Sequence, residues 1–433
     1  MAVQLPVPFL TEADPDKVGE GSLDPLGMTS IADRLAEEIA PDVTARMSRI
    51  RFLTAIAAGA TIAGGLVREV AADGRTPAYL AYEWIVVESM ARRPPEDTGS
   101  IPGIQKARRV VGRTPSGHLD AGSYLQVPKV FGFHGVHKRL GRGINLIDSE
   151  LLPLDLGADL LRAWESDQGL QGFAERVPRT PGGRLSRNLV TEVGKTLEAG
   201  RVTTKPGSHL WGHLAQALQP AGAGRRERKL LWEALVDREQ PVRSELVEAL
   251  RPLASENISE AQALRQVKAQ ASTDLKLRLA AIDAYERVAW LLNGALRAIQ
   301  FISSNQGAQP VMPDQLASHV AIARASKELP GAIARAVECL SPVGQDDLFE
   351  RNCEAFADHL APPALADALL SRHELIQEEK GGKRPWLERS KDGGFVVRPP
   401  YRTTEDAVVE DGYVHPYRVG ALSSFILDLR KDK

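Results

Sequence analysis

Apolar side chains recur at helical spacing near the start of the chain, in residues 29–41. Ile31, Leu35 and Ile39 follow one another at intervals of four residues, so they share one face of a helix. Pro41 ends this predicted helix, because proline has no backbone N–H to donate and its ring clashes with the preceding turn.

The same periodicity predicts several longer helices. Residues 43–72 and 78–93 are expected to form a second and a third helix, and the three pack together as an N-terminal helical unit. Residues 226–380 are helical almost throughout, and residues 274–304 form the most regular helix among them. The predicted fold class is mainly α: multi-helical, with a winged-helix-like module and a small mixed α/β C-terminal segment.

The winged-helix-like module is predicted for residues 103–165 from the order of its elements. A helix, a turn near Gly132–Gly135, a short basic helix, a short strand over residues 144–148 and a helix from Asp155 follow one another. Helix, turn, helix, strand and helix is the order of a DNA-binding winged helix. Pro128 interrupts the first helix and weakens the pattern.

Changes in composition and periodicity divide the chain into six predicted segments. These are an acidic flexible arm (1–28), the N-terminal helical unit (29–102), the basic winged-helix-like module (103–165), an irregular connector (166–225), a helical bundle (226–380) and a basic and aromatic C-terminal cap (381–433).

The overall composition is that of a soluble globular protein. Of the 433 residues, 43% are hydrophobic and 25% are charged, and the net charge is -2, so a surface for nucleic acid or membrane has to be local. The N-terminus lacks the pattern of a signal peptide, and the most apolar run, residues 52–67, is too short to span a bilayer. We therefore expect a cytoplasmic protein with no membrane partner. The two cysteines, Cys339 and Cys353, exclude a disulfide framework and are expected to be buried.

Positive charge is concentrated in two stretches of the chain. Residues 103–142 hold eight Lys and Arg against the single acid Asp120, and residues 380–402 hold seven against two. Phosphate groups attract such clusters, and Trp and Tyr near the second one could stack on bases. The predicted nucleic-acid-binding residues are Lys106, Arg108, Arg109, Arg113, Lys138, Arg139, Arg142, Lys383, Arg384, Trp386, Arg402, Tyr417 and Arg418.

A purely structural alternative stays open for the C-terminal cluster. Residues 1–40 hold eight acids and two bases, so the basic C-terminal segment could dock onto this acidic stretch, within the chain or between subunits.

Motifs for catalysis are sparse. The chain has no phosphate-binding G-x-x-x-x-G-K-[ST] loop and no G-x-S-x-G, so no cofactor is predicted. The pairs His209/His213 and His134/His137 have helical spacing but supply only two ligands each, and no metal site is predicted.

A metal-dependent nuclease remains an alternative, because such enzymes use two or three acids around a divalent ion. Its acids would come from the C-terminal region, from Glu388 and Asp392 together with Glu374 or Glu378, with Lys391 as the accompanying lysine.

Five short motifs resemble those of certain uncharacterised bacterial helical proteins found in gene islands with antiviral or restriction-type genes. They are Leu26-Gly27, Ala32-Asp33-Arg34-Leu35 and Arg49-Ile50-Arg51-Phe52 near the start, and "GKRPWLE" and "YVHPYRVGAL" near the end. The resemblance covers about a quarter of the chain, brings no catalytic residues, and implies a DNA-directed defence component.

The sequence therefore predicts a non-catalytic nucleic-acid-binding subunit of a multi-protein bacterial complex, with duplex DNA as the expected ligand. Its protein partners would include an ATPase or helicase encoded nearby. The alternatives are the metal-dependent nuclease and a helical scaffold that binds only protein.

Overall fold

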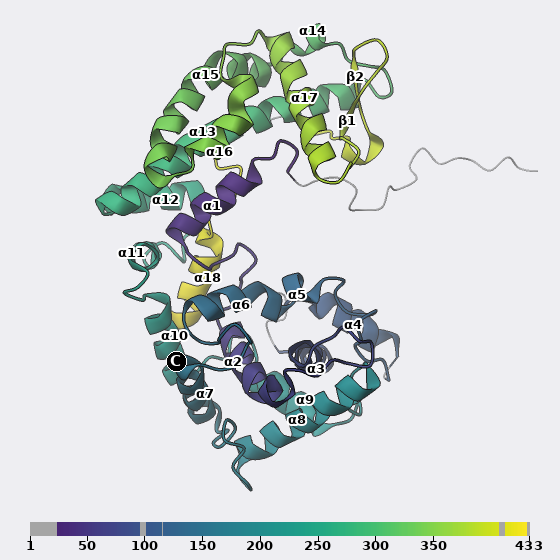
Figure 1. Ribbon diagram of the computed structural model, residues 1–433, viewed down its shortest axis with the longest axis vertical. Helices are drawn as coiled ribbons and strands as arrows, with labels where there is room; N and C mark the ends of the chain where they lie inside the picture. The colour runs from purple at the N-terminus through teal and green to yellow at the C-terminus, as the bar shows by residue number, and fades with distance from the viewer. Residues whose placement is uncertain (1–23, 96–100, 115, 407–411, 431–433) are drawn as a thin grey trace, which may run out of the picture. The chain divides into compact units, whose positions relative to one another are not determined.

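The computed structural model describes residues 24–95, 101–114, 116–406 and 412–430 (Figure 1). Within these residues the protein is mainly α-helical, as predicted, and one antiparallel pair of short strands is the only sheet. None of the described helices has both the length and the apolar character needed to cross a membrane.

The chain divides into two compact units. The first contains residues 1–35 and 272–416, and the second contains residues 36–271 and 417–433. The division falls within α1 (Thr29–Ile39), whose Ile31, Leu35 and Ile39 are buried as the spacing predicts.

The first unit is built around two long helices, α13 and α15, which pack along one another. Ser272 caps α13 by accepting a hydrogen bond from the backbone N–H of Leu275. Strands β1 and β2 pair antiparallel, with Leu387 opposite Val397. Its elements are α13 (Thr273–Asn305), α14 (Pro313–Leu316), α15 (Val320–Leu340), α16 (Asp346–Cys353), α17 (Pro362–Glu379), β1 (Leu387–Arg389) and β2 (Phe395–Val397).

The second unit has α2 at its centre. Every residue of α2 except Thr61 is buried, and the helix packs against α3, α6, α7 and α8. Small side chains at many of its positions allow neighbouring helices to approach closely. The helices are α2 (Phe52–Ala63), α3 (Ala78–Arg92), α4 (Ile104–Arg113), α5 (Pro128–Phe131), α6 (Phe133–Gly143), α7 (Asp155–Gln168), α8 (Pro181–Ala199), α9 (His209–Ala217), α10 (Arg225–Leu235), α11 (Pro241–Leu250), α12 (Glu260–Gln270) and α18 (Val419–Arg430).

The predicted winged-helix module is not confirmed. Residues 103–165 form α4 to α6 and most of α7, but the expected strand is reduced to an isolated bridge between Ile147 and Pro153. No β-hairpin wing occurs among the described residues of this segment. Instead α4 packs on α3 and α6 packs on α2, so the segment belongs to the core of the second unit.

The structure also differs from the sequence prediction between residues 170 and 225, where α8 and α9 occupy about half of a stretch expected to be irregular. Thr180 caps α8, and Pro181 occupies the first turn of the helix, where its lack of a backbone N–H breaks no helical hydrogen bond. Gly182 is needed there because an added Cβ would lie 1.7 Å from the carbonyl oxygen of Leu170. A Pro-Gly-Gly run that suggests a loop therefore begins a 19-residue helix.

Candidate anion-binding groove

The predicted cations of α4 lie at the surface of the second unit. Lys106, Arg109 and Arg113 are exposed, and no ion pair joins them to another residue that the structure describes; Arg108 is half-buried. Three of the four α4 positions are therefore available for contact with a ligand.

The predicted cations of α6 are held by their neighbours. Lys138 donates to the carbonyl of Lys129 (3.2 Å), and partial burial, with the nearby charges of Arg142 and Lys129, lowers the pKa of its amino group. Arg139 pairs with Glu37 (2.6 Å), and Arg142 donates to carbonyl oxygens of the loop after α6. These side chains carry less free positive charge than their count suggests.

The predicted C-terminal contacts fall in the first unit and are also partly occupied. Lys383 is exposed, whereas Arg384 pairs with Glu388 at 2.8 Å. Trp386 is half-buried and stacks on Tyr401, with ring centroids 5.2 Å apart and the planes 12° from parallel. A ring already stacked inside the protein has one face fewer for a base.

Of the last three predicted residues, only Arg402 is exposed. Tyr417 is fully buried and Arg418 is only 7% exposed, both within the second unit. The structure therefore does not place Tyr417 and Arg418 where a nucleic acid could touch them, and it assigns the predicted residues to two different units.

Two of the acids considered for a nuclease are engaged in ion pairs. Glu388 accepts from Arg384, and Glu374 accepts from Arg389 at 3.1 Å. Asp392 is exposed in the turn between β1 and β2. No group of three or more His, Cys, Asp or Glu side chains that could hold a metal ion occurs in the part of the chain that the structure describes.

One histidine pair lies in the core of the second unit. The Nδ1 atom of His134 lies 3.1 Å from the buried carboxylate of Glu83, and Nδ1 of His137 lies 3.1 Å from the carbonyl oxygen of Phe133. Burial lowers the pKa of His137 to about 4. These two side chains act within the packed core.

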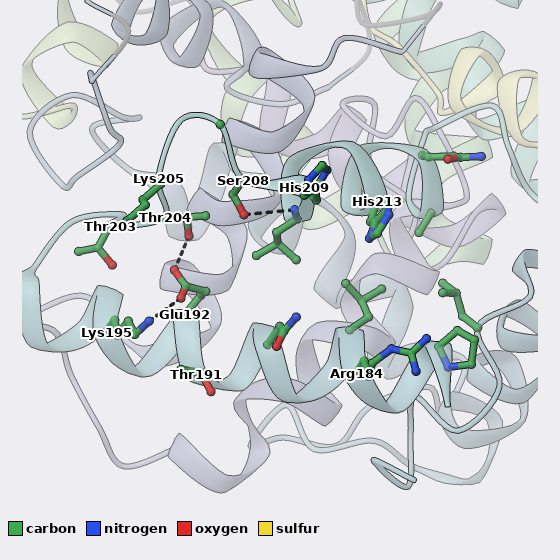
Figure 2. A pocket seen from close by; sticks show the side chains of 18 of the residues that line it. Arg184, Thr191, Glu192, Lys195, Thr203, Thr204, Lys205, Ser208, His209 and His213 are labelled. Carbon is green, nitrogen blue, oxygen red and sulfur yellow. Dashed lines mark hydrogen bonds and ion pairs between the residues drawn. The ribbon is translucent and has the colours of Figure 1, made fainter. Parts of the chain in front are cut away.

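The other histidine pair lies in a large groove of the second unit. His209 and His213 are exposed and belong to the lining of a cavity of about 1100 Å³ between α8 and the segment formed by residues 203–208 and α9 (Figure 2). Other side chains in its wall are Arg184, Asn188, Thr191, Glu192, Lys195, Thr203, Thr204, Lys205, Ser208 and Gln216. Polar groups thus come from both sides of the groove.

Helix α8 supplies one wall as a polar stripe. Arg184, Asn188, Thr191 and Lys195 are spaced by four, three and four residues, so they follow one face of the helix, and all four are exposed. Their buried counterparts on the opposite face hold α8 against α2 and α3. The wall is therefore rigid although its side chains reach into solvent.

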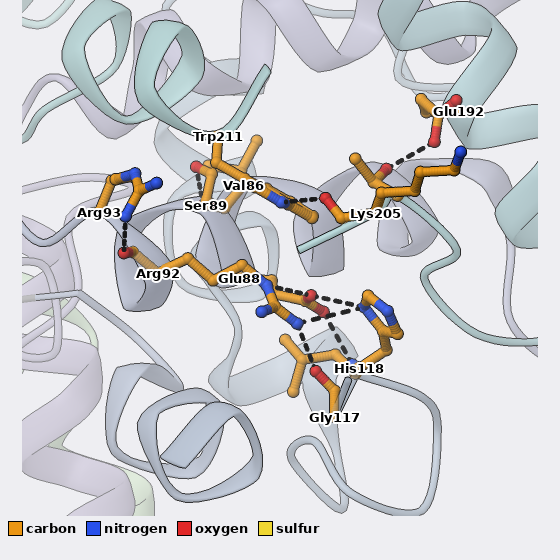
Figure 3. Close-up of polar contacts among 12 residues, drawn as sticks. Val86, Glu88, Ser89, Arg92, Arg93, Gly117, His118, Glu192, Lys205 and Trp211 are labelled. Atoms are coloured by element: carbon orange, nitrogen blue, oxygen red, sulfur yellow. Dashed lines mark hydrogen bonds and ion pairs between the residues drawn. The ribbon is translucent and has the colours of Figure 1, made fainter. Parts of the chain in front are cut away.

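The facing wall is fixed by hydrogen bonds at both ends of a short loop. Thr204 donates its hydroxyl to Glu192 at 2.6 Å, which ties the loop to α8. Ser208 caps α9 by accepting from the N–H of Leu210. The indole Nε1 of Trp211 donates to the carbonyl of Lys205 at 2.9 Å, as Figure 3 shows.

A buried polar cluster contacts Trp211 through Arg92. The guanidinium carbon of Arg92 lies 5.3 Å from the centre of a Trp211 ring, and Arg92 donates to Glu88 at 2.8 Å (Figure 3). Glu88 is fully buried and also contacts His118 Nδ1 (2.8 Å) and the N–H of Leu119 (2.8 Å). A carboxylate with several hydrogen-bond partners is stable in a core. Glu88 thereby holds Arg92 against the indole of Trp211, which in turn bonds to the carbonyl of Lys205.

The groove has a positive charge balance. Arg184, Lys195 and Lys205 are cationic, and Glu192 is the only acid in the lining. Glu192 already accepts from Thr204 and from Lys195 (2.8 Å), so Glu192 and Lys195 compensate each other, and Arg184 and Lys205 supply the net positive charge. The lining contains no Phe, Tyr or Trp. The groove can therefore attract an anion and donate hydrogen bonds to it, but it offers no aromatic ring for stacking.

The sequence prediction did not include this groove, although a signal for it exists. Residues 176–205 hold seven Lys and Arg against two acids, an excess comparable to that of the two clusters that were singled out. Because the region was expected to be irregular, these cations were not expected to share a surface. Arg184 and Lys195 lie on one face only because the region forms a helix.

Comparison of the chain with protein-family models, with curated proteins and with solved structures gives no match. Its function is therefore argued from its own residues.

Proposed function

We propose that this protein is a non-catalytic nucleic-acid-binding subunit and that the groove between α8 and α9 contacts the sugar-phosphate backbone. The observation that carries the proposal is the net positive charge of the groove: Arg184 and Lys205 have no acid partner in the lining, and the third cation, Lys195, pairs with the single acid, Glu192. Backbone binding draws its free energy from such cations, which displace the counterions condensed on the phosphates.

The dimensions of the groove favour a polymer over a small anion. Arg184 and Lys195 are eleven residues apart on α8, which corresponds to roughly 16 Å along the helix axis. Its volume of about 1100 Å³ exceeds that of most small-molecule pockets, and 13 of its 19 lining residues have polar side chains. An extended chain of phosphates matches cations distributed in this way.

Exposed cations elsewhere remain part of the proposal. Lys106, Arg109 and Arg113 on α4 belong to the same unit as the groove, and Lys383 and Arg402 form a second group in the first unit. Without aromatic rings in the groove, we expect contacts to phosphate and sugar, and hence little dependence on base sequence. Duplex DNA is the first ligand to test, with single strands and RNA beside it.

The test is fluorescence anisotropy with labelled DNA and RNA over a range of salt concentrations. With roughly two phosphate contacts, from Arg184 and Lys205, the logarithm of the association constant should fall with log salt at a slope of about -1.8, so each contact is worth about eightfold at 0.1 M relative to 1 M salt. The double variant Arg184→Glu/Lys205→Glu should bind at least ~60-fold more weakly at 0.1 M salt.

The matched control is Lys229→Glu/Arg238→Glu, which changes the charge by the same amount at exposed positions of the second unit outside the groove lining. It should weaken binding far less. The proposal fails if the folded wild-type protein binds none of these ligands at low salt, or if the groove and control variants lose affinity equally.

A protein-binding scaffold is the second candidate, and a groove in the first unit with one apolar wall favours it. Pro330, Ile333, Ala334 and Val337 of α15 line a cavity of about 690 Å³ together with residues of α16. An Ile333→Asp/Val337→Asp variant should lose any protein partner that co-purifies with the wild type. The predicted ATPase or helicase partner would be identified by mass spectrometry of such a complex.

A further inference from the structure

Three apolar side chains are exposed together at α5 of the second unit. Val127, Val130 and Phe131 are 46%, 45% and 44% exposed, and their spacing places them on one face of a helical turn. The backbone N–H groups of Val130 and Phe131 both donate to the carbonyl of Val127 at 3.0 Å, so the three residues belong to the same turn. Apolar side chains that are exposed side by side mark a surface that contacts another molecule.

The turn that carries these side chains is fixed by close backbone packing. A Cβ added at Gly135 of α6 would lie 2.6 Å from the carbonyl carbon of Lys129 and 2.7 Å from the backbone nitrogen of Val130. The N–H of Gly132, between the two helices, donates to the carbonyl of Pro128 at 2.9 Å. Because α5 approaches α6 through its backbone, its apolar side chains are left at the surface in a defined position.

Two unpaired cations accompany the apolar face. The guanidinium carbon of Arg46 lies 4.5 Å from the centre of the Phe131 ring, and both Arg46 and Lys129 are exposed. No ion pair joins Arg46 or Lys129 to another residue that the structure describes. Arg46 occupies one face of the ring, so the ring has its other face for a ligand.

The acids near α5 are already compensated. Asp42 accepts from Arg139 at 3.3 Å. Glu83 of α3 is buried and accepts from the hydroxyl of Tyr124 and from the N–H of His134, both at 2.9 Å. The charged side chains of residues 41–51, α5 and α6 are Asp42, Arg46, Arg49, Arg51, Lys129, Lys138, Arg139 and Arg142. Arg49 and Arg51 are paired with acids elsewhere, and the remaining balance is positive.

We propose that Phe131 stacks on a base of a single-stranded nucleic acid while Arg46 and Lys129 contact neighbouring phosphates. The inference rests on the proposed function and adds a base contact that the groove between α8 and α9 cannot make. Proteins bind single strands by combining cations with aromatic rings, because every base has a face on which a ring can stack. Charged residues, Lys among them, are depleted in the cores of protein interfaces, so a protein partner fits this face less well.

The experiment is fluorescence anisotropy with an oligothymidylate of about 20 nucleotides, longer than the usual site of a single-strand-binding domain, and with an abasic strand of equal length. The abasic strand has the same phosphates and no bases, so the wild type should bind it more weakly. Phe131→Ala should weaken binding of the oligothymidylate by roughly 5- to 150-fold, as loss of one base–aromatic stack does, and leave binding of the abasic strand unchanged.

Two further variants make the comparison specific. Phe131→Trp keeps an aromatic ring and should retain the preference for the strand with bases. Leu277→Ala, which shortens an apolar side chain that is 46% exposed in the first unit, is the matched control and should bind both strands like the wild type. Circular dichroism establishes that every variant is folded.

The outcomes separate this inference from the proposed function. Equal binding of both strands by the wild type overturns the inference and leaves backbone binding intact. A preference for bases that persists in Phe131→Ala also overturns it. If Phe131→Ala keeps its nucleic-acid affinity but loses self-association in analytical ultracentrifugation, the face is a protein interface and the inference is wrong. Absence of binding to either strand at low salt overturns the proposed function itself.

Discussion

The buried ion pair between Arg51 and Glu227 allows a sharp test of what holds the second unit together. Arg51 is 2% exposed and donates from Nε to Glu227 at 3.0 Å, and its two terminal nitrogens donate to the carbonyls of Gln219 (2.6 Å) and Ala217 (3.0 Å). Glu227 also accepts from the hydroxyl of Thr54 at 2.6 Å. The pair thus joins the start of α2 to α10 and to the end of α9.

Replacing Arg51 with Met removes the charge and retains most of the side-chain volume. Removing one member of a buried pair typically costs about 3–5 kcal/mol, because the remaining charge is left without compensation. We expect Arg51→Met to lower the free energy of unfolding by this amount. Adding Glu227→Gln should then recover at least ~1 kcal/mol, because the neutral amide needs no counter-charge and can still accept from Thr54.

The assay is urea unfolding followed by far-UV circular dichroism, with hydrogen exchange of peptides from α2 and α10 to locate the change. The decisive quantity is the sign of the change in unfolding free energy that Glu227→Gln causes in the wild type and in Arg51→Met. Glu227→Gln should destabilise the wild type, where it strands Arg51, and stabilise Arg51→Met. If it destabilises both, or if Arg51→Met costs under about 1 kcal/mol, the pair does not carry the role assigned to it.

Three further predictions concern single positions of the second unit. Burial lowers the pKa of His137 to about 4. The stability that neutral His137 confers is therefore complete above about pH 6.5, the ordinary pKa of histidine, and is lost as the pH falls towards 4. The loss should approach ~3 kcal/mol, and the urea midpoint of His137→Gln should depend less on pH than that of the wild type. Thr180→Ala removes the cap of α8 and should cost about 1 kcal/mol, whereas Thr180→Ser should cost only a few tenths of that, both read from urea midpoints. Gly132→Ala would bring a Cβ to 1.9 Å from the buried carboxylate of Glu83 and should lower the unfolding free energy by about 1–3 kcal/mol; an unchanged thermal midpoint would contradict that close contact.

Regular helices were predictable because their evidence is local. The expected helices over 78–93 and 274–304 correspond to α3 (Ala78–Arg92) and α13 (Thr273–Asn305). In each case the repeat of apolar residues within the segment decides the structure.

The start of α8 was not predictable in this way. Pro181, Gly182 and Gly183 carry the composition of a loop, and the reason for the glycines lies in carbonyl groups of a preceding segment. Only the folded structure shows that close packing, and not backbone freedom, requires them.

The sequence also could not show which cations are neutralised by an acid. Arg139 is paired with Glu37, which lies 102 positions earlier, while Arg184 and Lys205 have no acid of their own in the groove. A count of charges along the chain cannot distinguish these cases, because neutralisation depends on neighbours in space. Burial of Tyr417 has the same origin, since its backbone N–H bonds to Glu260, 157 positions away.

The order in which the second unit is assembled follows from where its last helix lies in the chain. Helix α18 packs with α10, α11 and α12, and Glu260 accepts from the N–H groups of both Tyr417 and Gly420 at its start. Between α12 and α18 the ribosome makes residues 272–416, all of which belong to the other unit. During synthesis, α10 to α12 must therefore keep an uncovered apolar face until the ribosome has made α18, and a chain that stops before α18 would keep that face exposed to chaperones and proteases.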